Sequence, residues 1–161
     1  MIYFSSLPYK YSNIYVIKEN DFVTRLFLND SSFSYFYEEF KPKRNDLILE
    51  DEITQLAEYL NRKRKSFNIK FKLLGTNFEK LVWERILSIE YSDVKTYSDI
   101  ATEIKMISAT RAVGNACRKN VLPIIVPCHR VVSKKDLGGF FGKKSEFLTI
   151  KSYLLNLERA S

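Results

Sequence analysis

Residues 123–132, Pro-Ile-Ile-Val-Pro-Cys-His-Arg-Val-Val, form the stretch on which the interpretation of the whole chain depends. The apolar, β-branched run predicts a buried strand, and Pro127 fixes the backbone immediately before a cysteine and the only histidine of the protein. A thiol is a poor nucleophile until it loses its proton, and neighbouring cationic groups stabilise the thiolate. The pattern therefore indicates a reactive Cys128 beside His129 and Arg130. It also fits a buried cysteine and a hydrogen-bonded histidine with purely structural roles.

The composition indicates a folded, basic protein. Of the 161 residues, 45% are hydrophobic and 14% aromatic, which excludes a disordered chain. The formal net charge is +7, with 12 basic against 10 acidic residues up to Gly75 and 14 against 9 after it. This basic excess suits a polyanionic partner such as nucleic acid. Two cysteines and the absence of a long apolar run predict an intracellular protein with reduced thiols and no membrane partner.

Residues 1–75 are expected to form a small α/β domain that ends in a linker. The predicted elements are strands at 11–17 and 22–28 with a hairpin turn at 19–21, a helix at 31–40 capped by Ser31 or Ser32, and an amphipathic helix from Asp51 to about Lys65. This region contains neither cysteine nor histidine, so it offers no thiolate or imidazole ligand to a metal.

Residues 76–161 are expected to form a mainly helical domain. The predicted elements are a helix from the Thr76–Glu79 capping box to about Ile89, a helix-turn-helix of residues 97–104 and 109–118 capped by Thr96 and Ser108, the strand at 123–132, and a helix at 145–158. Leu81 belongs to the predicted buried stripe of the first helix, and Trp83 is expected to pack between the two domains. Gly114 costs a helix about 1 kcal/mol relative to alanine, which suggests close packing or close approach to a ligand.

Residues 125–132, together with Arg111-Ala112-Val113-Gly114 and Asn120, resemble the active-site signature of the O6-alkylguanine-DNA alkyltransferases. The likeness runs without a gap from about Thr96 to Val132 and resumes at the helix that ends in Glu158. It implies suicidal DNA repair, in which a methyl or other alkyl group passes from O6 of guanine, or O4 of thymine, in duplex DNA to the cysteine. It implies no metal and no organic cofactor.

The resemblance also implies a fold and a setting. The fold class would be α/β (α+β), with a ribonuclease-H-like first domain and a winged-helix-like helix-turn-helix and a short active-site strand in the second. The protein would be a cytoplasmic monomer, or nuclear in a eukaryote.

The resemblance assigns catalytic roles to five residues. Cys128 would accept the alkyl group, His129 would act as base through a water molecule, and Glu158 would orient the imidazole. Tyr97 would help to rotate the target phosphate and would donate a hydrogen bond to guanine N3. Asn120 would couple DNA contact to the strand that carries the thiol.

DNA contacts are implied by the same likeness. Arg111 would fill the space left when the base is flipped out from the minor-groove side. Further contacts are expected from Tyr97, Thr96, Ser108, Ala109, Ala112, Gly114 and Arg118. The substrate pocket would be lined by Pro127, Val131, Gly139, Phe140 and Phe141.

The chain departs from the family pattern after Val132. The loop is one residue shorter than usual, Phe140 replaces a tyrosine, and Phe141 stands where serine or alanine is common, so the range of adducts is open. Two other classes fit parts of the chain. A non-catalytic DNA-binding module would give no covalent product, and a thiol hydrolase is disfavoured because its histidine should be remote in sequence from its cysteine.

Overall fold

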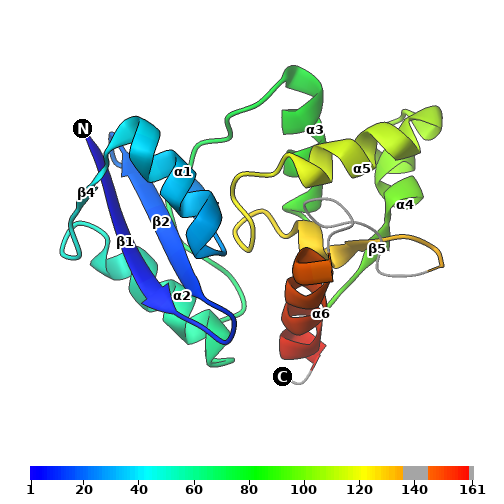
Figure 1. The fold of residues 1–161 in the computed structure, drawn as a ribbon. Coiled ribbons are helices and arrows are strands. Elements are labelled where there is room, and N and C mark those ends of the chain that lie inside the picture. The colour runs from blue at the N-terminus through cyan, green and yellow to red at the C-terminus, as the bar shows by residue number, and fades with distance from the viewer. Residues whose placement is uncertain (136–144, 160–161) are drawn as a thin grey trace. The chain divides into compact units, whose positions relative to one another are not determined.

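The computed structural model describes residues 1–135 and 145–159. The chain divides into two compact units, Met1–Leu73 and Leu74–Ser161. Figure 1 shows the first unit as a sheet with helix α1 in front of it and helix α2 behind it, and the second unit as a group of helices with two very short strands. This mixed architecture confirms the predicted α/β (α+β) class.

The sheet of the first unit has the strand order β3-β2-β1-β4. Its strands are β1 Ile2–Pro8, β2 Asn13–Glu19, β3 Phe22–Phe27 and β4 Lys43–Arg44. The first three pair antiparallel, and β4 pairs with β1 in parallel. The predicted hairpin turn is confirmed, because Asn20 and Asp21 have φ values of 48° and 68°. Left-handed values at both central residues match the twist of the flanking strands.

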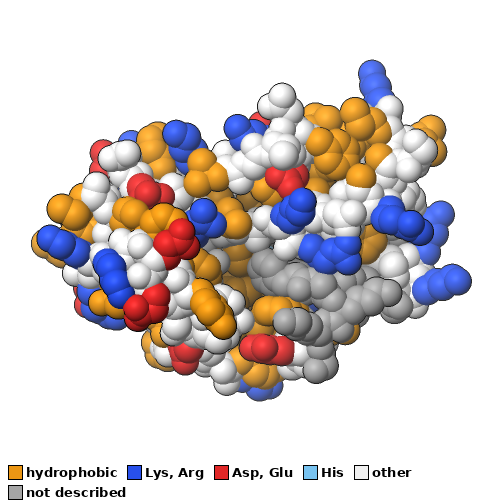
Figure 2. Space-filling model, turned by 45° about the horizontal axis from the view of Figure 1, so that its top comes forward, with side chains coloured by type: hydrophobic (Ala, Val, Ile, Leu, Met, Phe, Trp, Pro, Cys, Tyr) orange, Lys and Arg blue, Asp and Glu red, His pale blue; other side chains and the backbone are white. Residues whose placement is uncertain are grey.

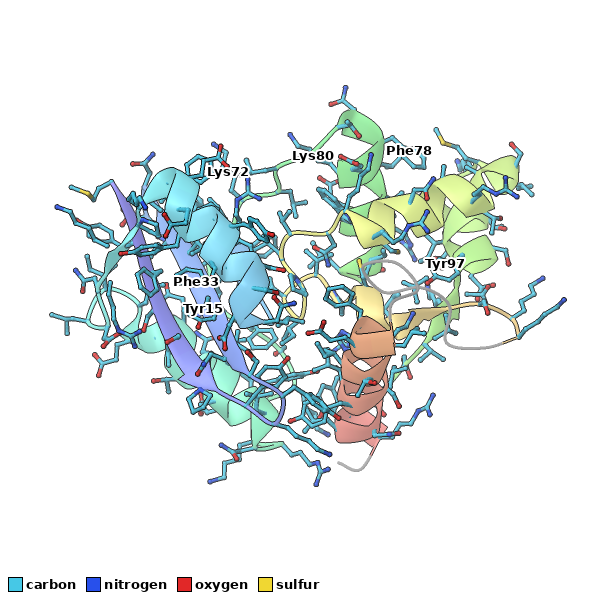
Figure 3. The ribbon with its side chains drawn as sticks, in the orientation of Figure 1. Tyr15, Phe33, Lys72, Phe78, Lys80 and Tyr97 are labelled. Carbon is cyan, nitrogen blue, oxygen red and sulfur yellow. The ribbon has the colours of Figure 1, made fainter. Side chains whose placement is uncertain are left out.

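Helix α1, Asp30–Phe40, covers one face of this sheet with aromatic side chains. The ring of Phe33 stacks on the ring of Tyr15 with a centroid distance of 3.9 Å (Figure 3). Alternate residues of a strand face opposite sides of the sheet, so the strand residues that meet α1 lie on one face. The buried cluster at this face comprises Phe4, Ile17, Phe33 and Phe36.

Two helix boundaries in the first unit differ from the sequence-based prediction. The side chain of Asn29 accepts a hydrogen bond from the backbone N–H of Ser32 and caps α1, so the predicted cap at Ser31 or Ser32 is wrong. Helix α2, Glu50–Leu60, ends earlier than predicted. Arg62 has a φ of 59°, which stops the helix, so Lys63, Arg64 and Lys65 lie beyond its end.

The second unit carries the segments to which the sequence assigned chemistry. Its elements are α3 Asn77–Ile86, β5 Lys95–Thr96, α4 Tyr97–Glu103, the 3-10 turn η1 Ile107–Ala109, α5 Thr110–Arg118, the 3-10 turn η2 Cys128–Arg130, β6 Val131–Val132 and α6 Ser145–Arg159. Strands β5 and β6 pair in parallel, with Thr96 opposite Val132. This pairing sets the start of α4 beside the segment that follows the cysteine. No helix within the described ranges is long and apolar enough to cross a membrane.

Helix α3 begins with the predicted capping box. The Thr76 hydroxyl accepts from the backbone N–H of Glu79, whose carboxylate accepts from the N–H of Thr76. Trp83 lies in the core of the second unit, where its indole N–H donates to the carbonyl of Ala116 at 2.9 Å. Its expected packing between the two domains stays a prediction. Leu81, which the helical spacing predicted to be buried, is exposed.

Gly75 is expected to tolerate no side chain. A Cβ atom there would lie 2.5 Å from Cζ3 and 2.6 Å from Cη2 of Trp83, whose ring is held in place by its own hydrogen bond. Gly75→Ala should therefore lower the free energy of unfolding by about 1–3 kcal/mol, measured by denaturant titration. The matched control is Gly114→Ala, where the nearest atom is Cδ1 of Tyr97 at 3.9 Å.

Alanine at position 114 meets only ordinary van der Waals contact inside a helix. The control should raise the free energy of unfolding by about 0.5–1 kcal/mol, because alanine loses less backbone entropy than glycine. A Gly75→Ala protein as stable as the Gly114→Ala protein would contradict the expected clash.

Candidate active site

Cys128 opens η2, a single 3-10 turn, and is only 1% exposed. The strand predicted for residues 123–132 is limited to β6, because the residues before the cysteine form a turn in which the N–H of Val126 donates to the carbonyl of Leu122 at 2.8 Å. The prediction of an extended backbone at Cys128 and His129 is therefore wrong. The two side chains follow one another around a helical turn.

Asn120 holds the turn before the cysteine together. Its side-chain N–H donates to the carbonyl of Val126, and its Oδ1 accepts from the N–H of Leu122, both at 2.9 Å. The same side chain hydrogen-bonds to the thiol of Cys128. One buried amide thus connects the end of α5 with the backbone that delivers the sulfur atom.

Glu158 of α6 collects four hydrogen-bond donors on its buried carboxylate. Its Oε1 accepts from Nε of Arg130 at 2.9 Å and from the N–H of Ser92 at 3.1 Å. Its Oε2 lies 2.7 Å from Nε2 of His129 and accepts from a terminal nitrogen of Arg130 at 3.0 Å. His129 and Glu158, 29 positions apart in the chain, are thus in contact, as the resemblance implied. Every lone pair of the carboxylate is engaged.

The tautomer of His129 follows from these contacts. Burial lowers the pKa of the imidazole below its ordinary value of 6.5, against the opposing effect of the Glu158 carboxylate. A neutral ring beside a carboxylate, which only accepts, must carry its hydrogen on Nε2. Nδ1 therefore bears a lone pair, and no described protein group hydrogen-bonds to this buried atom. The ring is poised to accept a proton at Nδ1.

The thiol of Cys128 is protonated at rest. Burial raises its pKa well above the ordinary value of 9.0, and the neighbouring thiol of Cys117 raises it further. The amide of Asn120 and the positive charge of Lys151 act in the opposite direction. The site therefore holds a neutral thiol and a neutral imidazole, a pair that stays inert until a base removes the proton.

These two shifts predict a stability plateau bounded on both sides. Below about pH 6.5 His129 is protonated in the unfolded chain but stays neutral in the folded protein, so the free energy of unfolding falls as the pH drops. Above about pH 9.0 the unfolded chain releases a proton that folded Cys128 keeps, so stability falls as the pH rises. Each slope is at most about 1.4 kcal/mol per pH unit.

Urea titrations between pH 5.5 and 10 measure both limbs of this curve. Cys128→Ser should flatten the alkaline limb and keep the acidic one. Identical alkaline slopes in the two proteins would show that the thiol keeps no proton on folding.

Helices α4 and α5 form the predicted pair of helices joined by a short turn. The Thr96 hydroxyl accepts from the N–H of Asp99, as predicted, and caps α4. The predicted cap at Ser108 is wrong, because that residue lies inside η1 and no side chain caps α5. Tyr97 is the first residue of α4 (Figure 3).

The residues predicted to contact DNA gather on α4, η1 and α5. Arg111, Ser108 and Arg118 are exposed, whereas the remaining five are half-buried: Thr96, Tyr97, Ala109, Ala112 and Gly114. Several Lys and Arg side chains lie on the face of the second unit that Figure 2 shows. Because Ala112 and Gly114 are small, the backbone of α5 is accessible beside the exposed side chain of Arg111.

The predicted pocket residues are placed only in part. Pro127 and Val131 are buried beside the cysteine. Gly139, Phe140 and Phe141 lie outside the described residues.

Two residues at this site escaped the sequence analysis. Cys117 lies against the thiol of Cys128, and Lys151 of α6 is fully buried. Lys151 lies seven positions before Glu158, and that spacing sets both residues on one face of a helix. This spacing is the signal that could have revealed the lysine.

The chemistry available to the site is nucleophilic. Within the described part of the chain, no cluster of three or more His, Cys, Asp or Glu side chains is placed to hold a metal ion. A thiol, a base with a free lone pair and an orienting carboxylate can together deliver a sulfur nucleophile. Because these groups share a compact unit with a pair of helices that exposes arginines, the class is a DNA-acting protein with a covalent thiol step.

Comparison with known proteins agrees with this class. Residues 77–160 match the family model described as "6-O-methylguanine DNA methyltransferase, DNA binding domain". The constitutive methylated-DNA–protein-cysteine methyltransferase of Bacillus subtilis is 37% identical over 167 residues, covering 100% of this chain and 98% of that protein. The corresponding protein of Archaeoglobus fulgidus is 40% identical over 106 residues, covering 65% of this chain and 71% of that protein.

Solved structures show the same relationship over nearly the whole chain. The crystal structure of O6-methylguanine methyltransferase from Mycobacterium tuberculosis has a TM-score of 0.85 at 26% identity, covering 99% of this chain and 94% of that one. The OGT of the same organism in complex with DNA has a TM-score of 0.86 at 28% identity, covering 98% and 93%.

This chain belongs to the methylated-DNA–protein-cysteine methyltransferase family. It is an enzyme of DNA repair by alkyl transfer, and the family resemblance inferred from the sequence is confirmed. Residues 77–160 contain its DNA-binding domain.

Proposed function

We propose that Cys128 accepts a methyl or other alkyl group from O6 of guanine, or O4 of thymine, in duplex DNA, and that each molecule does so once. The observation that carries this proposal is the buried pair of His129 and Glu158, which leaves Nδ1 of the imidazole as a base in the same helical turn as the thiol. The reacting protein is a monomer that acts where thiols stay reduced.

The chemical step begins with proton transfer. Nδ1 of His129 takes the thiol proton through one water molecule, and the Glu158 carboxylate stabilises the resulting imidazolium through Nε2. The thiolate attacks the alkyl carbon, the S–C bond forms, and the C–O6 bond breaks. The electron pair passes into the guanine ring, where Tyr97 donates a hydrogen bond to N3 and offsets the developing charge. The guanine anion then takes up one proton from water at N1, and His129 returns the thiol proton to water. The thioether has no route back to a thiol, so turnover ends.

DNA is engaged through α5 from the minor-groove side. Its small residues Ala109, Ala112 and Gly114 allow the helix backbone to approach a narrow groove, and Arg111 is exposed and able to enter the base stack. The O6 atom of guanine lies inside the duplex, so the base must be flipped out at a cost of about a few kcal/mol in lost stacking and pairing. Arg111 would occupy the vacated space.

Mixing the protein with a duplex containing one O6-methylguanine should add one methyl group to Cys128, detected by peptide mass. Cys128→Ser should bind the duplex and acquire no methyl group. Cys117→Ser is the matched control, because Cys117 is the other buried thiol and its loss leaves the acceptor intact. An unmodified Cys128 in folded protein after complete mixing, or a methyl group on Cys117, would contradict the proposal.

A further inference from the structure

A run of basic residues without any acidic residue follows helix α2. Between Glu58 and Glu79 the sequence contains no aspartate or glutamate. The six cations of this stretch, all in residues 62–72, are Arg62, Lys63, Arg64, Lys65, Lys70 and Lys72. All of them except Arg64 are exposed. A surface that is merely solvated mixes charges of both signs, so this basic segment, residues 62–72, has the composition of a surface that binds a polyanion.

The basic segment is an ordered part of the first unit. Gln55 of α2, only 3% exposed, accepts from the backbone N–H of Asn68 at 2.9 Å and donates to the carbonyl of the same residue at 3.0 Å. The guanidinium of Arg64 donates to the carboxylate of Glu58 and to the carbonyl of Ser66. Blocks of like charge are commonly disordered. This one is fixed to a buried side chain, so binding a partner would cost little backbone entropy.

The end of the basic segment runs beside strand β3. The N–H of Val23 donates to the carbonyl of Lys70 at 2.9 Å, and the N–H of Lys72 donates to the carbonyl of Val23 at 3.0 Å. Ile69 is buried and Phe71 is half-buried, whereas both lysines are exposed. Figure 3 labels Lys72 on the stretch that leads to α3. Alternate residues of an extended chain face the same side about 6.6 Å apart, so the two lysines form a pair on one side of the segment.

Three lysines of the basic segment are available to a partner. Lys63, Lys70 and Lys72 form no ion pair with any carboxylate of residues 1–135 and 145–159. We propose that the basic segment is a second DNA-binding surface, which contacts phosphates of the duplex beside the target base. This inference goes beyond the function proposed above, because it assigns a DNA contact to the first unit, whereas the DNA-binding family model matches residues 77–160.

Duplex DNA is the polyanion that the position of the segment favours. Only residues 73–76 separate Lys72 from α3, with which the match to the DNA-binding domain begins. A duplex carries one negative charge per about 1.7 Å of its axis, so phosphates on either side of a target base are available to a neighbouring basic surface. Contacts of lysine with phosphate carry no sequence information. They would add affinity in any sequence context, which suits the search for a modified base.

The test measures the affinity for a long undamaged duplex at NaCl concentrations from about 50 to 200 mM, where each phosphate contact contributes about 0.9 to the slope of log K against log[salt]. Lys70→Gln combined with Lys72→Gln should reduce the magnitude of this slope by about 1.8 and weaken binding by at least about tenfold at the lowest salt concentration. Adding Lys63→Gln should reduce the slope by about a further 0.9. Melting temperatures equal to that of the wild-type protein show that the variants are folded.

Lys41→Gln combined with Lys43→Gln is the matched control. It removes the same charge from two exposed lysines at the same spacing. Lys43 belongs to β4, at the opposite edge of the sheet from β3. The control should keep the wild-type slope. An equal reduction of the slope in both double variants would show an effect of net charge alone and would overturn the inference, as would a wild-type slope after Lys70 and Lys72 are replaced.

Methyl transfer from an O6-methylguanine duplex at saturating concentration separates this inference from the proposed function. Both double variants should transfer the methyl group at the wild-type rate, because the replaced lysines lie in the first unit and Cys128 lies in the second. The expected loss of slope in a protein that transfers no methyl group would support the inference and contradict the proposed function. Normal transfer with an unchanged slope would do the reverse.

Discussion

Glu158→Gln is expected to slow methyl transfer at least about 100-fold and to lower the free energy of unfolding by about 3–5 kcal/mol, the cost of leaving a buried charge without its partner. The substitution changes almost no volume, but the glutamine amide nitrogen cannot accept a hydrogen bond. Each carboxylate oxygen accepts from two donors, so whichever oxygen is replaced, an N–H of Arg130 meets another N–H. His129 then loses the negative charge that stabilises its protonated form.

Glu146→Gln is the matched control, because Glu146 is an exposed carboxylate on the same helix. It should leave stability and the rate of transfer unchanged. Transfer is measured by quenched single-turnover assays and stability by urea titration. A Glu158→Gln protein with the wild-type rate would remove the carboxylate from the proposed mechanism.

Arg130 decides how much of the lost stability is due to an unpaired cation. Its guanidinium donates to Glu158 with two nitrogens and to the carbonyl of Ile89 at 2.8 Å. In the Glu158→Gln background, Arg130→Met should lower the free energy of unfolding far less than it does in the wild-type protein. The reason is that Glu158→Gln leaves the guanidinium unpaired in a low-dielectric interior, and Arg130→Met removes that unpaired charge. Additive losses would show that the two side chains act independently.

Capping motifs and helical spacing predicted the helices of the second unit better than they predicted the turn before Cys128. Thr76 and Thr96 each precede an acidic residue at the third helical position, and both capping boxes are present. The turn before Cys128 escaped prediction because its conformation is imposed by a remote side chain, the amide of Asn120. Side-chain hydrogen bonds to the backbone compete with strand formation, and sequence periodicity does not reveal them.

The φ of 74° at Ile124 shows the same limit. A left-handed conformation costs a residue with a Cβ atom about 1–2 kcal/mol, so propensity alone would never place isoleucine there. Pro123, Pro127 and Asn120 fix both ends of the turn. The burial of the Ile124 side chain, which is only 2% exposed, offsets the cost of its backbone conformation. The β-branched run was thus correctly interpreted as buried and wrongly interpreted as extended.

The proposed catalytic residues could be named from the sequence only because of the family resemblance. Spacing alone gives Glu158 the character of a surface carboxylate, since nothing local shows that α6 buries it against Arg130. Lys151 shows the same error, because lysine in an amphipathic helix is expected to be exposed and this one is buried. Glu158 is buried where α6 meets Arg130 of η2, and Lys151 is buried where α6 meets Val131 of β6 and Tyr97 of α4. No local pattern encodes these tertiary contacts.

Asn120→Asp is expected to slow methyl transfer at pH 7.5 by about 100-fold and to cost about 2–3 kcal/mol of stability, the penalty for a buried hydrogen bond turned into a repulsion. Aspartate keeps the oxygen that accepts from Leu122, but its second oxygen faces the carbonyl of Val126, which the asparagine N–H now reaches at 2.9 Å. The new negative charge would also lie beside the Cys128 thiol and oppose its ionisation.

The pH dependence distinguishes this cause from a general disturbance of the turn. Burial and the facing carbonyl raise the pKa of the introduced carboxyl, so the folded protein binds a proton that the unfolded chain lacks, and stability should rise as the pH falls from 8 toward 6. Once protonated, the aspartic acid donates its O–H to Val126 and restores the lost bond. Asn156→Asp, exposed on α6, is the control and should show no such rise. An Asn120→Asp protein whose stability is flat over this range would show that the amide N–H does not hold the turn.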